Sequence, residues 1–144
     1  MKTVLKNGNV FYQNKIQKLD VEIDGETISQ IGHDLDGENI IDCTDLLVTP
    51  GFVDLHVHLR EPGFEHKETI ETGSKSAVKG GFTTICPMPN TKPTPDNVEV
   101  LQQIIEKAKK VNLCNILPYA SVTKGEKGEE LVDFEALKKA GAIA

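Results

Sequence analysis

Two different patterns of apolar and polar positions divide the chain near residue 50. Before that point apolar residues come in short runs separated by polar turns, and no stripe with the 3.6-residue period of a helix occurs. Asn7-Gly8 and Asp24-Gly25 are dipeptides that favour tight turns between strands. The pattern therefore predicts a β-rich segment over residues 1–50, with a hairpin at the first dipeptide and a further turn at the second.

Past residue 50, segments with strand character alternate with segments with helix character. An apolar stripe with the spacing of one buried helix face runs from Val98 to Ala108. Thr94 followed by Pro95 has the pattern of a helix cap with proline at the first helical position. The predicted strands are residues 52–59, 82–86, 113–120 and the start of a fourth at 142–144, and the predicted helices are residues 68–79, a helix from Pro95 on, and residues 132–140.

Alternating β and α units predict the α/β class, with a parallel sheet and helices packed outside it. Three units and a fraction are too few to close a (β/α)₈ barrel, which needs eight units and about 250 residues. The sequence is compatible with a small open sheet or with the front part of a longer chain, and its end at a strand start favours the second. Alone, such a piece should aggregate or stay partly molten, because it would leave a sheet edge and apolar faces uncovered.

The candidate chemistry lies on the first strand after residue 50. Alternate side chains of a strand share a face, which would place Asp54, His56, His58 and Arg60 together and the intervening apolar residues under the helices. Two imidazoles on one strand face can bind the same metal ion. A catalytic zinc has about three protein ligands, so the remaining ligands must lie elsewhere. Taken alone, the two histidines are equally well explained as polar residues on a half-exposed strand.

Two further residues could bind a substrate at the same rim. The Arg60 guanidinium suits a carboxylate because it can grip both oxygens at once, although a surface arginine paired with Glu61 or Glu65 is the alternative. Asn90 follows the second strand, and its amide offers both a donor and an acceptor. Taken alone, Asn90 is better explained as a turn residue or a helix cap.

Composition narrows the class of protein. The 144 residues are 38% hydrophobic and 26% charged, which excludes a disordered chain. The net charge of −6 argues against a nucleic-acid partner, and no apolar run approaches the roughly 18 residues of a membrane span. The three cysteines form no pairwise pattern and the start lacks a secretory signal, so we expect a cytoplasmic protein without a membrane partner.

The run Pro50–Gly63 resembles the signature of the dihydroorotase family, within the cyclic amidohydrolase superfamily. The His-x-His pair marks only the superfamily. Arg60 is more specific, because allantoinases carry Asn at the matching place and hydantoinases lack the Arg-Glu-Pro-Gly run. Further stretches that resemble the same family are Glu65–Gly73, Gly80–Thr84 and Pro87–Thr91.

The resemblance implies a fold and a set of roles. Residues 51–144 would be the first three to four βα units of a metal-dependent (β/α)₈ TIM barrel, and residues 1–50 a β-rich segment of a small β-sandwich domain. His56 and His58 match the first two zinc ligands of the family, and Arg60 and Asn90 match positions that hold the substrate carboxylate. The other ligands and the general base would lie beyond Ala144, so no catalytic residue falls within this chain, which we expect to be inactive alone.

The implied activity is a metal-dependent cyclic amide hydrolysis. Members of the family interconvert N-carbamoyl-L-aspartate and L-dihydroorotate in pyrimidine biosynthesis, usually with two zinc ions, and a homodimer of the full-length protein is compatible with the resemblance. The alternatives are another cyclic amidase, such as an allantoinase or a dihydropyrimidinase, and a non-catalytic scaffold or fragment that keeps the fold.

Overall fold

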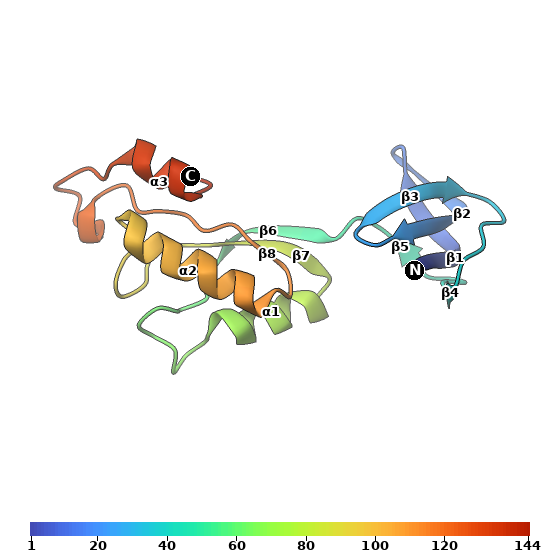
Figure 1. Ribbon diagram of the computed structural model, residues 1–144, viewed down its shortest axis with the longest axis horizontal. Coiled ribbons are helices and arrows are strands. Elements are labelled where there is room, and N and C mark those ends of the chain that lie inside the picture. The colour runs from blue at the N-terminus through green and yellow to red at the C-terminus, as the bar shows by residue number, and fades with distance from the viewer. The chain divides into compact units, whose positions relative to one another are not determined.

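The computed structural model describes all residues 1–144 and divides into two compact units, Met1–Pro50 and Gly51–Ala144 (Figure 1). The division falls where the hydrophobic pattern changes. None of the helices is long and apolar enough to cross a membrane.

The first unit is one five-stranded sheet. Its strands run in the order β3-β2-β1-β4, and β5 pairs with β1 as well. β1, β2 and β3 are antiparallel, whereas β4 and β5 lie parallel to β1. The strands are β1 (Lys2–Tyr12), β2 (Lys15–Asp24), β3 (Thr27–Gly32), β4 (Asn39–Asp42) and β5 (Leu47–Val48).

The hairpin predicted at Asn7-Gly8 is wrong, because β1 runs straight through these two residues. Asn7 has a φ of 62°, and the register with β2 shifts between Leu5 and Gly8, which makes this a β-bulge. The hairpin turn lies instead at Gln13 and Asn14, both at positive φ, as a two-residue turn of type I′ requires. The tolerance for positive φ that makes Asn-Gly a good turn also makes it a good bulge, so the dipeptide alone does not separate the two.

Asp20 on β2 holds the bulge in place. Its carboxylate accepts the backbone N–H of Asn7 at 2.8 Å and of Leu35 at 3.1 Å, and lies 3.2 Å from the Lys6 ammonium. Burial by itself would raise the pKa of this carboxyl, but the hydrogen bonds from Asn7, Lys6 and Leu35 outweigh it and hold the pKa below its ordinary value of 3.8.

The second unit is a three-stranded parallel sheet in the order β6-β7-β8, with helices in the connections. This arrangement confirms the α/β class. Figure 1 shows α1 and α2 side by side along the sheet, and α3 beyond α2. The elements are β6 (Phe52–Val57), α1 (Ile70–Lys79), β7 (Phe82–Pro87), α2 (Val98–Val111), β8 (Asn115–Ile116), the 3₁₀ turn η1 (Lys124–Glu126) and α3 (Phe134–Ala140).

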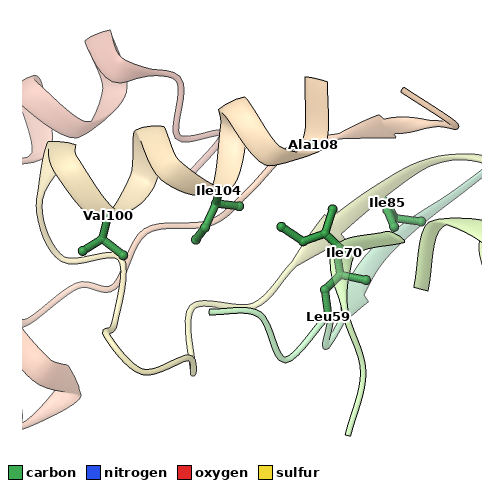
Figure 2. Packing of buried hydrophobic residues seen from close by; sticks show 6 residues of the cluster. All are labelled: Leu59, Ile70, Ile85, Val100, Ile104 and Ala108. Carbon is green, nitrogen blue, oxygen red and sulfur yellow. The ribbon is translucent and has the colours of Figure 1, made fainter. Parts of the chain in front are cut away.

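A compact apolar cluster joins the helices to the sheet (Figure 2). Ile70, at the first position of α1, is 1% exposed and packs with Ile85 of β7. α2 contributes Val100, Ile104 and Ala108, which recur every four residues and so lie on one face. Burying a side chain of this size contributes roughly 1.5–3 kcal/mol, so the cluster fixes the position of both helices. The sixth member, Leu59, comes from the segment that follows β6.

The strand predicted at residues 113–120 is shorter than expected, because β8 spans only Asn115–Ile116. The segment continues to bond β7 at alternate residues, with Leu117 donating to Ile85 and Tyr119 to Pro87. Pro118 lies between them and has no N–H to donate, which ends the regular pattern. The predicted fourth strand is not a regular strand either.

Two backbone bonds nevertheless tie the chain end to this segment. Ile143 donates to the Pro118 carbonyl at 3.0 Å, and Ala120 donates to the Ala144 carbonyl at 2.9 Å. Residues 142–144 therefore lie beside the chain that follows β8, on the side away from β7.

The start of α2 differs from the predicted Thr94-Pro95 cap. The helix begins at Val98, and Asn97 is its N-cap, with the side-chain oxygen accepting the Val100 N–H at 3.1 Å. Pro95 is instead buried before the helix, and its carbonyl accepts the Ser121 N–H at 3.2 Å. Val98 is the first residue of α2 and is 40% exposed. The prediction that it belongs to the buried stripe is therefore wrong.

We predict that Asn97→Ala lowers the free energy of unfolding by about 1 kcal/mol, because the first turn of α2 loses its cap. Thr94→Ala should cost clearly less, since the Thr94 hydroxyl makes only a 3.3 Å contact with the Thr91 carbonyl. Urea unfolding of both variants checks the order. A larger loss for Thr94→Ala would contradict the assignment of the cap.

We predict that Asp20→Asn lowers the free energy of unfolding by about 1–3 kcal/mol near neutral pH. The amide has one oxygen for the two N–H groups of Asn7 and Leu35, and it carries no charge to face Lys6. A carboxyl whose pKa is depressed by folding contributes stability above its unfolded pKa, and this is lost as pH falls through the folded value. The gap between wild type and variant should therefore narrow below the ordinary value of 3.8. Urea unfolding at neutral and acidic pH checks this, with the exposed Asp34→Asn as control. A gap that stays constant with pH would contradict the role of the charge.

Candidate functional site

The candidate site lies where β6 and β7 end. In a parallel sheet the carboxyl ends of neighbouring strands meet at one edge, which is where α/β proteins bind ligands. His58 directly follows β6, and Asn90 follows β7 by three residues. The Met88 N–H donates to the Val57 carbonyl at 2.9 Å, which ties the two strand ends together. The structure brings His58 and Asn90 into contact, with Nδ1 and Oδ1 2.9 Å apart.

The two histidines are neighbours in space. Their ring centroids lie 5.2 Å apart with the rings edge to face. His56 is exposed, whereas His58 is partly buried. The side-chain oxygen of Asp54 accepts the backbone N–H of His56 at 3.0 Å, so this carboxylate serves the backbone of its own strand.

The expected apolar face of β6 is only partly covered. Leu59 is buried and Val57 packs against the main cluster, but Val53 and Leu55 are 56% and 62% exposed. The expectation that both would pack under helices is therefore wrong for this structure. The reason is topological, because β6 is an edge strand that pairs with β7 alone. Its register with β7 also shifts between Asp54 and Val57, which breaks strict alternation.

The side chains at these strand ends are too few to form a complete metal site. Two imidazoles lie together, and no group of three or more His, Cys, Asp or Glu side chains is arranged to hold a metal ion. Imidazole nitrogen is a good ligand for zinc and other transition metals, so the pair fits such an ion in kind. Two ligands are fewer than a catalytic zinc needs.

Arg60 lies in a tight loop after the histidines. Its φ is 62°, in the left-handed region that a residue with a side chain adopts at a cost of about 1 kcal/mol or more. The Arg60 carbonyl accepts the Phe64 N–H, and the Leu59 carbonyl accepts the Glu61 N–H. These bonds hold the strained residue in place at the edge of the sheet.

The carboxylates beside Arg60 are engaged elsewhere. Glu61 accepts the Ile70 N–H at the start of α1 and pairs with Lys107 at 3.4 Å. Glu65 accepts the Gly63 N–H at 2.8 Å, and this bond lowers the pKa of its carboxyl. The Arg60 guanidinium forms no ion pair with either, so the alternative of a surface pair is not realised. Its charge remains available to an external carboxylate.

Sequence reasoning did not identify two of these contacts. Neither the bond between Asn90 and His58 nor the use of Glu61 to tie the start of α1 was expected. Asn90 is not a helix cap, because Asn97 caps α2. The alternative of a turn residue is realised, since the Thr91 N–H donates to the Pro89 carbonyl and closes a turn around Asn90. The one signal in the sequence was that Asn90 and His58 each follow a strand of a parallel pair.

The fold and the site define a class of protein, namely α/β proteins with a parallel sheet and paired histidines at its carboxyl edge. Comparison with known proteins identifies the family within this class. The dihydro-orotase-like family model matches residues 45–144. A dihydroorotase of Staphylococcus aureus (strain Mu50) is 53% identical over 147 residues, covering 98% of this chain and 34% of that protein. A dihydroorotase of Bacillus subtilis (strain 168) is 49% identical over 147 residues, with 100% and 34% covered.

The chain belongs to the dihydro-orotase-like family, which confirms the resemblance inferred from the sequence. It spans about a third of the length of the curated relatives it matches.

Solved structures share the fold. L-hydantoinase (dihydropyrimidinase) from Arthrobacter aurescens matches with a TM-score of 0.73 and 26% identity, over 84% of this chain and 28% of that one. D-hydantoinase (dihydropyrimidinase) from a Thermus species matches with a TM-score of 0.72 and 34% identity, over 88% and 29%. The similarity therefore extends through both the strands and the helices of most of the chain.

Proposed function

We propose that the protein to which this chain belongs is a zinc-dependent dihydroorotase. It would interconvert N-carbamoyl-L-aspartate and L-dihydroorotate in pyrimidine biosynthesis. The observation that carries the proposal is the unpaired guanidinium of Arg60 in the loop that directly follows the paired histidines. Curated relatives named dihydroorotase, at 49–53% identity, support the same activity.

In this proposal the second unit supplies the first three to four βα units of a (β/α)₈ barrel. The parallel order β6-β7-β8 with connecting helices supports it, as do the exposed apolar residues of β6, which a neighbouring strand and helix would cover. Residues 1–50 would contribute a β-rich segment to a small β-sandwich domain. All regular elements of that unit are strands, which supports this assignment.

His56 and His58 would hold the metal, with two zinc ions per subunit of the longer protein. Their neighbouring imidazoles are ligands of the right kind, and the missing ligands would come from residues outside 1–144. When bound, the metal would supply Lewis acidity and lower the pKa of a water molecule at the site. The general base would also come from outside these residues, so no residue of this chain is assigned to proton transfer.

Arg60 and Asn90 would bind the carboxylate of the substrate. Dihydroorotate carries this group on its ring, whereas the neutral rings of dihydropyrimidines and hydantoins do not. A guanidinium that grips both carboxylate oxygens would favour the first substrate and fix the ring relative to the histidines. The exposed amide of Asn90 lies at the same strand ends and keeps its nitrogen free to donate.

A second candidate is a cyclic amidase for neutral rings, because the hydantoinases (dihydropyrimidinases) above share the fold. The absence of an ion pair at Arg60 favours dihydroorotate over this candidate, and over an allantoinase. A third candidate is a non-catalytic scaffold. A substrate assay with dihydroorotate, dihydrouracil and allantoin separates the three.

The small-molecule substrate would be the main partner, with a homodimer of the longer protein as the assembly to test. We assign the protein to the cytoplasm. The three free cysteines, Cys43, Cys86 and Cys114, support a reducing compartment.

We predict that His56→Ala, in the full-length protein, loses most of its bound zinc and its dihydroorotase activity, because one of the few ligands disappears. His33→Ala is the matched control, since this exposed histidine lies in the first unit. Metal analysis after dialysis measures the zinc content. Full zinc occupancy in His56→Ala would contradict the ligand assignment.

We predict that Arg60→Ala raises KM for dihydroorotate at least 10-fold, as expected when a charged hydrogen bond worth about 1.5–3 kcal/mol is lost. Its zinc content should stay at the wild-type level. Arg60→Lys should fall in between, because an ammonium keeps the charge but cannot grip both oxygens. Steady-state kinetics with dihydroorotate and with dihydrouracil measures the effect. An unchanged preference between the two substrates would contradict the role of Arg60.

A further inference from the structure

We propose that Asn90 is a positioning residue for His58, fixing which ring nitrogen of that histidine carries the proton. The observation is the 2.9 Å contact between Asn90 Oδ1 and His58 Nδ1. An amide oxygen can only accept a hydrogen bond, so Nδ1 must donate. The proton of the neutral ring therefore resides on Nδ1, and Nε2 keeps a free lone pair for a metal ion.

The contact is held by the backbone on both sides. The Met88 N–H bonds the Val57 carbonyl, directly before His58. The Thr91 N–H bonds the Pro89 carbonyl at 2.8 Å and closes a tight turn around Asn90. Two prolines flank Met88 and restrict the backbone further. Asn90 is thus presented to the imidazole by a rigid connection between two strand ends.

The contact with Asn90 changes which nitrogen of the His58 ring carries the proton. A free neutral imidazole side chain prefers its proton on Nε2, which would block that nitrogen as a ligand. The Asn90 oxygen reverses this preference and also fixes the rotation of the ring. Groups that orient a histidine in this way typically change metal affinity 10–100-fold when they are removed. The inference rests on the proposed function in one respect, since it takes His58 as a metal ligand.

The first test reads the ring directly in the metal-free, full-length protein. Long-range ¹H–¹⁵N correlation spectra of ¹⁵N-histidine-labelled protein report which nitrogen is protonated, and the loss of one signal set in His58→Gln identifies His58. We expect the Nδ1–H form in the wild type. The Nε2–H form in the wild type would overturn the proposal, and this measurement needs no Asn90 variant to fold.

The second test measures affinity for Zn²⁺ alone, by competition with a chromophoric chelator. Asn90→Ala should bind zinc 10–100-fold more weakly, as loss of an orienting group predicts. Asn90→Asp should bind at least as tightly as wild type, because a carboxylate accepts the same N–H. Asn115→Ala is the matched control, since its exposed amide bonds only Thr84, at 3.3 Å. Zinc affinity that is unchanged in Asn90→Ala would overturn the proposal.

The two proposals fail in different ways. If Asn90→Ala keeps its zinc affinity but shows a raised KM for dihydroorotate at saturating zinc, Asn90 serves only the substrate. The positioning role is then overturned while the proposed function stands. If zinc affinity depends on Asn90 but the wild type does not turn over dihydroorotate, the positioning role stands and the proposed function is overturned.

Discussion

The backbone hydrogen bond from Met88 to Val57 is the interaction on which the candidate site depends. It ties the ends of β6 and β7 together, so the segments that follow these two strands leave the sheet at the same place. His58 follows on one side and Asn90 on the other, which is why a contact between them forms at all. The apolar cluster, which includes Leu59 and Ile85 from the two strand segments, helps to keep the two ends together. Backbone pairing sets the position of the polar groups, and core packing preserves it.

Charge is distributed around this edge in a way that frees Arg60. The neighbouring carboxylates of Glu61 and Glu65 are satisfied by backbone N–H groups, and Glu61 also by Lys107. These bonds stabilise the loop and the start of α1 without neutralising the guanidinium. The left-handed backbone at Arg60 adds a local cost of about 1 kcal/mol or more, which the backbone hydrogen bonds of the loop offset. On the proposed function, this unpaired guanidinium is the group that would bind the substrate carboxylate.

The sequence pattern was sufficient for the α/β class and for most elements, because the periodicity of apolar residues reports which faces are buried. It failed where one local signal serves two structures. Asn7-Gly8 forms a bulge rather than a turn, and the cap of α2 is Asn97 rather than Thr94. It could not foresee that Asn90 bonds His58, because periodicity places residues on faces and does not name their partners across the sheet.

On the proposed function, the incomplete metal site and the open sheet edge have one physical cause. β6 carries His56 and leads directly into His58, and it is also the strand whose outer edge is unpaired. Val53 and Leu55 on that strand remain more than half exposed, which is unfavourable for apolar side chains of this size. In a closed barrel a further strand would pair with this edge, and further βα units would bring ligands to the same rim. Covering β6 and completing the metal site would therefore be parts of a single folding event, so zinc affinity and barrel stability should be coupled.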